Sequence, residues 1–147
     1  MDIATAEIGQ HEIAGAKANP RIVEYHSSTW LKATSDEVPW CSSFVNWCLI
    51  KAVVRPTRSA AAKSWLTWGE ETEPRLGAIV VIRKDAAGVD PATGSLTGYH
   101  VGFFVAKGES HIRLLGGNQG DSVKESAFPL SVYSVVGMRW PVDEIVT

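Results

Sequence analysis

Hydrophobic and polar positions divide the chain into a helical first part and a strand-forming second part. Before Pro74 the predicted elements are helices, because apolar residues recur at the spacing that buries one face of a helix. The best-defined helix is predicted over residues 41–52. Its apolar face consists of Cys41, Phe44, Val45, Cys48 and Ala52.

Three weaker helical segments accompany it. A short helix is predicted over residues 2–10, with Gly9 near its end. A second begins at Asn19-Pro20, where the asparagine caps the helix and the proline occupies its first turn. An alanine-rich stretch, residues 59–68, stops at Gly69.

After Pro74 the pattern predicts strands. Residues 77–83 form a continuous β-branched run typical of a buried strand, and residues 135–140 predict the last strand. Between them, residues 99–106 and 111–115 predict a hairpin. Helices followed by strands indicate the α+β fold class, with N-terminal helices packed on an antiparallel sheet.

Length and composition limit the classes of function that the chain can have. We expect one domain over residues 1–147, acting as a monomer. The net charge of −2 and the lack of a basic stripe argue against nucleic acid as a partner. The sequence contains no run of about 18 apolar residues, so no membrane span is predicted. The N-terminus lacks a secretory signal, so we expect synthesis in the cytoplasm and another route to any external site of action.

Cys41 is the candidate nucleophile. Pro39-Trp40 leads directly into the helix, which places the thiol in the first turn, where free N–H groups favour a thiolate. Cys48 lies seven residues further on, roughly 10 Å away, so both cysteines should be free thiols. Cys48 is interpreted as core, and the plain alternative for Cys41 is also a buried structural thiol.

His100 is the candidate base. On its strand it shares a face with Gly102, Phe104 and Ala106, and we expect the cysteine helix to pack there, over the small residues. If residues 107–109 form the hairpin loop, Ala106 pairs with Ser110. Asn118 then lies diagonal to His100 and can orient its ring. A shift of one residue would reverse this placement, which leaves Gln119 as the local alternative.

Other candidate chemistry is weaker. The two cysteines and two histidines lack zinc-site spacing, and no metal or other cofactor is predicted. Asp85, Asp90 and Asp121 are interpreted as solvated loop residues. Trp40 is either a wall of a substrate groove or a hydrophobic staple for the helix.

Three sequence blocks carry a resemblance. They are PWCSSFVNWC at residues 39–48, GYHVGF at 98–103 and LGGNQG at 115–120. In this order they resemble the CHAP and NlpC/P60 group of cysteine peptidases and amidases. More narrowly, the chain is similar from near residue 2 to Pro141 to a bacterial and phage family of single-domain proteins. The resemblance implies a papain-like fold and hydrolysis of amide bonds in peptidoglycan.

The resemblance also implies roles for individual residues. Cys41 would be the nucleophile, His100 the base and Asn118 the orienting residue. Helix-start N–H groups would hold the oxyanion. The expected substrate contacts are Trp40, Ser42, Tyr99 and Gln119. No alternating acidic loop precedes Cys41, so the calcium site of some CHAP relatives is not expected.

The bond and the setting stay open at this point. The enzyme could be an N-acetylmuramoyl-L-alanine amidase or a stem-peptide endopeptidase. It could be a lysin released on lysis, or an injected antibacterial effector with a secretion component and an immunity protein as partners. The alternatives are a transamidase or deamidase on the same fold, and a binding or assembly module without turnover.

Overall fold

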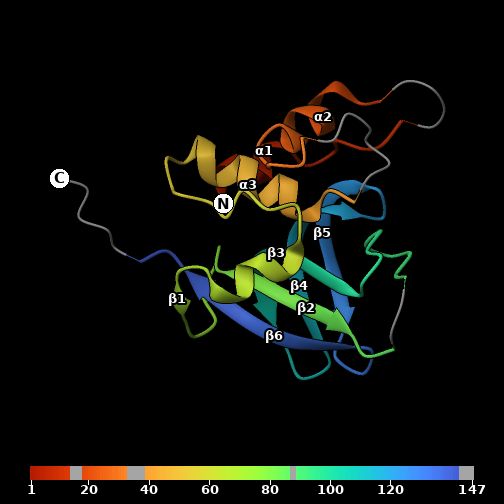
Figure 1. Cartoon of the computed structure of the whole chain (residues 1–147). Coiled ribbons are helices and arrows are strands. Elements are labelled where there is room, and N and C mark those ends of the chain that lie inside the picture. Colours follow the sequence, from red (N-terminus) through yellow and green to blue (C-terminus); the bar gives the residue numbers. More distant parts are fainter. Residues whose placement is uncertain (14–17, 33–38, 87–88, 143–147) are drawn as a thin grey trace.

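The protein has an α+β architecture in which helices lie on one side of an antiparallel sheet (Figure 1). The computed structural model describes residues 1–13, 18–32, 39–86 and 89–142. The predicted fold class, helices packed on an antiparallel sheet, is confirmed at this level. The helical elements are α1 (Asp2–Ala6), α2 (Pro20–His26), α3 (Cys41–Lys51) and the 3-10 helix η1 (Ala62–Thr67).

The predicted helix starts are confirmed at α2 and α3. The Asn19 side chain accepts a hydrogen bond from the Arg21 backbone N–H at 2.9 Å, and Pro20 is the first helical residue. Helix α3 begins at Cys41, as predicted. The other two segments are shorter than expected: α1 ends at Ala6, and the alanine-rich stretch forms only a 3-10 helix.

Helix α3 is buried on nearly all sides rather than on one face. Every residue from Cys41 to Leu49 is buried, including Ser42, Ser43 and Asn46. The cause is its central position, because β3 and β4 cover one side while α1 and α2 cover another. The predicted apolar stripe is therefore part of a helix whose polar face is also enclosed.

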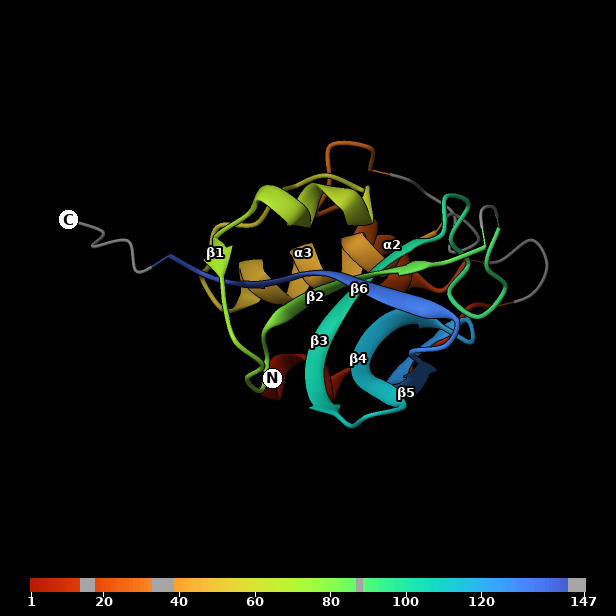
Figure 2. The same ribbon diagram turned by 90° about the horizontal axis from the view of Figure 1, so that it is seen from below.

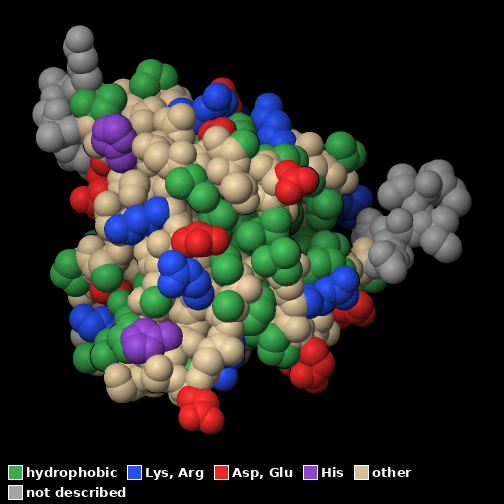
Figure 3. Space-filling view, turned by 180° about the vertical axis from the view of Figure 1, so that it is seen from behind, with side chains coloured by type: hydrophobic (Ala, Val, Ile, Leu, Met, Phe, Trp, Pro, Cys, Tyr) green, Lys and Arg blue, Asp and Glu red, His purple; other side chains and the backbone are tan. Residues whose placement is uncertain are grey.

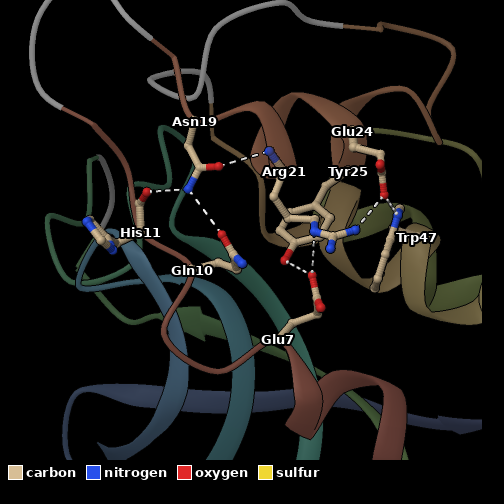
Figure 4. Close-up of polar contacts among 8 residues, drawn as sticks. All are labelled: Glu7, Gln10, His11, Asn19, Arg21, Glu24, Tyr25 and Trp47. Carbon is tan, nitrogen blue, oxygen red and sulfur yellow. Dashed lines mark hydrogen bonds and ion pairs between the residues drawn. The ribbon is translucent and has the colours of Figure 1, made fainter.

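A polar network ties the N-terminal segments to α3 (Figure 4). The Tyr25 hydroxyl donates to the Glu7 carboxylate at 2.7 Å, and Arg21 forms ion pairs with Glu7 at 3.2 Å and Glu24 at 3.1 Å. The Trp47 indole N–H donates to Glu24 at 2.7 Å. This network joins α1, α2 and α3 and satisfies the buried polar groups between them.

The sheet has six strands in the order β1-β6-β2-β3-β4-β5, and every neighbouring pair is antiparallel. Strands β2, β3, β4 and β6 correspond to predicted strands, while β1 and β5 were not predicted. The bounds are β1 (Glu70–Glu71), β2 (Ile79–Lys84), β3 (Tyr99–Lys107), β4 (His111–Gln119), β5 (Ser122–Pro129) and β6 (Tyr133–Trp140).

The predicted hairpin register between β3 and β4 is wrong. Ala106 pairs with Arg113 instead of Ser110, and the ladder is offset by a bulge between Phe104 and Ala106. The loop between the strands is three residues long, as predicted, but it comprises residues 108–110 instead of 107–109, and the Gly108 N–H donates to the His111 C=O at 2.9 Å. Each residue of β4 therefore lies opposite a different partner from the one expected.

The two faces of the sheet bury separate cores. On the helix side, Val101 and Phe103 of β3 pack with α3, and the rings of Phe44 and Phe103 lie 6.3 Å apart. On the other side, Ile82, Leu114, Phe128 and their neighbours form a second core. The sheet itself is curved (Figure 2). The expectation that α3 packs over Gly102 is wrong, because α3 covers the large apolar residues of β3 instead.

The surface carries mixed charge. Figure 3 shows Lys and Arg side chains interspersed with Asp and Glu on one face of the molecule, in keeping with the net charge of −2. Within the described ranges, no helix is long and apolar enough to cross a membrane.

Candidate active site

Three backbone N–H groups, those of Val101, Ser42 and Cys41, lie near the Cys41 thiol at the start of α3 and form the N–H cage of the site. The helix cap, Trp40, provides no side-chain hydrogen bond to the first turn. Burial is the largest influence and raises the pKa of the Cys41 thiol, while N–H groups of Val101, Ser42 and Cys41 itself act in the opposite direction. Cys41 is 6% exposed. The resting thiol is therefore protonated at neutral pH, and its surroundings are arranged to accept negative charge.

The Val101 N–H reaches the sulfur because of the strand geometry. The Phe104 N–H and C=O both bond to the segment just before β2, at Ala78 and Gly77. Backbone N–H groups alternate in direction along a strand, so the N–H of Val101, three residues earlier, points the other way, toward β4. The β3–β4 ladder includes no pair before Phe103↔Leu115. The N–H of Val101 thus lies beyond the paired region, near the Cys41 thiol.

Gln119 fixes the His100 ring and its tautomer. The Gln119 amide nitrogen donates to the carbonyls of Leu114 at 3.2 Å and Lys124 at 2.8 Å, which leaves Oε1 facing the imidazole. His100 Nε2 lies 2.9 Å from that oxygen and must be the N–H donor. The lone pair is therefore on Nδ1, which is buried and has no hydrogen-bond partner in the described part of the chain.

Glycine residues make room for this clamp. A Cβ atom on Gly116 would lie 2.5 Å from Gln119 Oε1, and one on Gly102 would lie 3.4 Å from it. Gly117 faces the opposite way, where a Cβ would lie 2.7 Å from both Phe44 and Trp40. The glycine run of β4 therefore lets the amide lie against His100 on one face and α3 approach closely on the other.

His100 is enclosed on the side of the sheet away from α3. Its ring centroid lies 5.5 Å from that of Phe128, and the side chain is fully buried. Burial lowers the pKa of His100 to about 4, while the Gln119 hydrogen bond and the Asp90 carboxylate act against that shift. The imidazole is therefore neutral at pH 7 and can accept a proton.

Asp90 is a buried residue that the sequence analysis placed in solvent. It is 2% exposed, and its carboxylate accepts hydrogen bonds from the Tyr133 hydroxyl at 2.6 Å and from the Thr93 hydroxyl at 3.2 Å. The Tyr133 ring packs edge to face with Phe128, which contacts His100. The interpretation as loop solvation is wrong, and the sequence offered little signal because Asp90 lies in a loop rich in polar residues.

Asn118 does not contact the imidazole in this structure. Its backbone has φ +58°, and its amide lies against Gly94, where a Cβ atom would be 2.4 Å from Nδ2. The bulge in β4 between Gly116 and Gln119 produces this geometry, so Gln119 rather than Asn118 points at His100. The alternative residue of the sequence analysis thus occupies the orienting position.

Two of the expected substrate-contact residues are buried and hydrogen-bonded within the fold. Trp40 is fully buried, and its indole N–H donates to Glu12 at 2.9 Å. Ser42 is also fully buried, and its hydroxyl donates to the Ser59 carbonyl at 2.6 Å. Tyr99 is half-buried beneath the ammonium group of Lys63, 5.8 Å from the ring centroid. Of the four expected contacts, only Tyr99 is more than marginally exposed here.

The structure thus brings Cys41 to the peptide that links His100 to Val101. The sulfur and the N–H of Val101 meet at this point, whereas the imidazole clamped by Gln119 lies on the opposite face of the sheet, against Phe128. The expectation that the Cys41 helix packs against the imidazole is therefore wrong for this structure. The described contacts include no hydrogen bond between thiol and imidazole. In the described residues, no group of three or more His, Cys, Asp or Glu side chains could hold a metal ion.

Neither the protein-family models nor the curated proteins compared with this chain give a match.

Proposed function

We propose that the protein is a papain-like cysteine hydrolase that cuts amide bonds in peptidoglycan. Cys41 is the nucleophile, His100 the general base and Gln119 the residue that orients the imidazole. The resemblance of three sequence blocks to CHAP and NlpC/P60 enzymes supports the substrate class. The Cys41 thiol at a helix start and the imidazole held by Gln119 support the reaction class.

One observation carries the proposal. Gln119 is held by two backbone carbonyls and in turn accepts the proton-bearing Nε2 of His100. The Nδ1 lone pair has no partner among the described residues, and the next residue, Val101, places its N–H near the Cys41 thiol. A thiol near backbone N–H groups and a clamped imidazole with a free lone pair are the two groups that general-base activation of a cysteine requires, and catalysis further requires the imidazole to reach the sulfur from the opposite face of the sheet.

The reaction follows from these roles. The imidazole must first move from its buried position to the sulfur; His100 Nδ1 then accepts the thiol proton while the sulfur attacks the substrate carbonyl carbon. Helix-start N–H groups, including that of Cys41, stabilise the oxyanion that forms. The imidazolium then gives its proton to the leaving amine as the C–N bond breaks. Water, deprotonated by neutral His100, attacks the thioester and releases the acid and the free thiol.

The resting site is a neutral pair rather than a thiolate–imidazolium pair. Burial raises the pKa of Cys41 and lowers that of His100 to about 4, so at pH 7 both groups are uncharged. Proton transfer is therefore coupled to substrate attack. The N–H cage lowers the cost of the developing charge at the moment it appears.

Purified protein incubated with isolated cell-wall sacculi tests the proposal, and mass spectrometry identifies the soluble products. We expect new amino groups matched by new carboxyl groups, with Cys41→Ala as the inactive control. The mass of the fragments distinguishes the muramoyl–alanine bond from a stem-peptide bond. Cross-linked products would point to a transamidase, and intact sacculi under all conditions would overturn the proposal.

A further inference from the structure

A second concave site lies beside the C-terminal half of α3, away from Cys41. This pocket is lined by Trp30, Ile50 and the segment 53–58, and has a volume of about 540 Å³. Sites for small ligands usually enclose about 300–1,000 Å³. Ile50 is nine residues beyond Cys41, which corresponds to roughly 14 Å along the helix axis. The pocket is therefore separate from the candidate catalytic residues.

The pocket combines an aromatic surface with two positive charges. Trp30 is 74% exposed, and the guanidinium of Arg58 lies 5.7 Å from the centroid of its ring. Arg55 is also exposed. Among the described residues, the ion pairs of arginine involve Arg21 and Arg113, so neither pocket arginine has a carboxylate partner there.

The walls of the pocket are held in place by the fold. The Arg58 N–H donates to the Asn46 side chain at 2.6 Å, and the Trp68 indole donates to the Arg55 carbonyl at 2.8 Å. The Trp30 N–H donates to the Arg58 carbonyl at 2.8 Å. These bonds fix the backbone that carries the arginines, which reduces the entropy lost when a ligand binds.

Two residues of the pocket have left-handed backbone conformations. Val53 has φ +60° and is 94% exposed, and Arg58 has φ +59°. A β-branched residue rarely adopts such a conformation, and strain of this kind concentrates at ligand sites. Because the Val53 side chain packs against little in the fold, a ligand is a reasonable source of contacts for it.

We propose that this pocket binds a carboxylate-bearing segment of a peptidoglycan strand. A sugar ring or alkyl chain packs on the indole of Trp30, and a carboxylate pairs with Arg55 or Arg58, whose forked N–H groups suit that anion. The identity of the ligand rests on the proposed function, because peptidoglycan supplies both sugar rings and free carboxylates. The pocket then retains the polymer while Cys41 acts elsewhere along α3.

Binding to sacculi tests the pocket separately from hydrolysis. In a Cys41→Ala background, sedimentation with sacculi measures binding, and Trp fluorescence follows titration with a soluble disaccharide–tetrapeptide. We expect Trp30→Ala, and separately Arg55→Glu combined with Arg58→Glu, to weaken both by at least about tenfold. Trp30→Phe should retain most of the affinity. Lys107→Glu, a charge reversal at the exposed last residue of β3, should leave the affinity unchanged.

The outcomes separate the two proposals. If sacculi are cut but the pocket variants bind and cut like the parent, the pocket proposal is wrong and the proposed function stands. If binding depends on Trp30 and the arginines but no bond is cut, the pocket stands and the hydrolase proposal fails. Absence of any binding by the Cys41→Ala protein, or an equal loss with Lys107→Glu, also overturns the pocket.

Discussion

The two cysteines of α3 are both buried, yet their surroundings differ in the sign of the field they experience. At Cys41, burial raises the thiol pKa, and three backbone N–H groups act in the opposite direction. At Cys48, burial raises the pKa and the Glu7 carboxylate raises it further. Burial alone therefore does not separate a reactive thiol from a structural one. The neighbouring groups do: three backbone N–H groups favour a thiolate at Cys41, whereas at Cys48 the unfavourable effect of the Glu7 carboxylate exceeds the favourable effect of the N-terminal ammonium group.

The largest expected effect separates the two sulfurs directly. Cys41→Ala should lower kcat on sacculi by roughly four orders of magnitude or more, because no other group replaces the nucleophile. Cys48→Ala should keep its activity within a few-fold but lose about 1–2 kcal/mol of unfolding free energy, because it leaves a small cavity in the core. Product release and urea unfolding measure the two effects. Equal activity loss in both variants would contradict the assignment.

The titration of His100 makes the stability of the fold depend on pH. His100 titrates near 4 in the fold and near 6.5 when unfolded, so the unfolded chain binds the extra proton first. The contribution is complete above pH 6.5 and is lost as the pH falls toward 4, amounting to roughly 3 kcal/mol. Urea unfolding between pH 4 and 7 measures it. A His100→Gln variant should lack this part of the pH dependence.

Gln119 should matter more than Asn118, because only Gln119 contacts the imidazole. Gln119→Ala removes the bond that fixes the tautomer and should lower kcat by roughly 10–100-fold. Asn118→Ala should lower it much less. Gln119→Glu places a carboxylate beside His100, which raises the pKa of the imidazole and shifts the acid limb of the pH–rate profile upward. An equal or larger loss with Asn118→Ala would restore Asn118 to the orienting position.

How far the sequence predicts this molecule depends on the range of the interactions involved. Local signals predict the starts of α2 and α3, because a capping asparagine or a Pro-Trp turn acts within a few residues. The same local signal, the start of a helix after Pro39-Trp40, identifies Cys41 as the candidate nucleophile. The pairing of distant strands is harder to predict from the sequence, because two bulges determine which residues of β4 face His100. A shift of one position in a strand exchanges its faces.

The polar residues of the site were the least predictable part. Asp90 lies in a polar loop and reads as solvated, but Tyr133, which is 43 residues away, folds over it. Gln119 and Asn118 are adjacent amides, and only the φ +58° conformation at Asn118 decides which of them reaches the imidazole. Strand β5 was missed because its buried positions are few, so the hydrophobic pattern of 122–129 is weak.

The smallest expected effect concerns Asp90, which acts on His100 through space. Its negative charge favours the imidazolium, so Asp90→Asn should lower the pKa of His100 and move the acid limb of kcat/KM to lower pH by less than about one unit. The amide oxygen can still accept from the Tyr133 hydroxyl, so the fold should survive. Thr93→Val removes a hydroxyl bonded to the same carboxylate without changing any charge, and it serves as the matched control. A shift in both variants would indicate that loop packing, rather than charge, tunes the base at the Cys41 end of the helix.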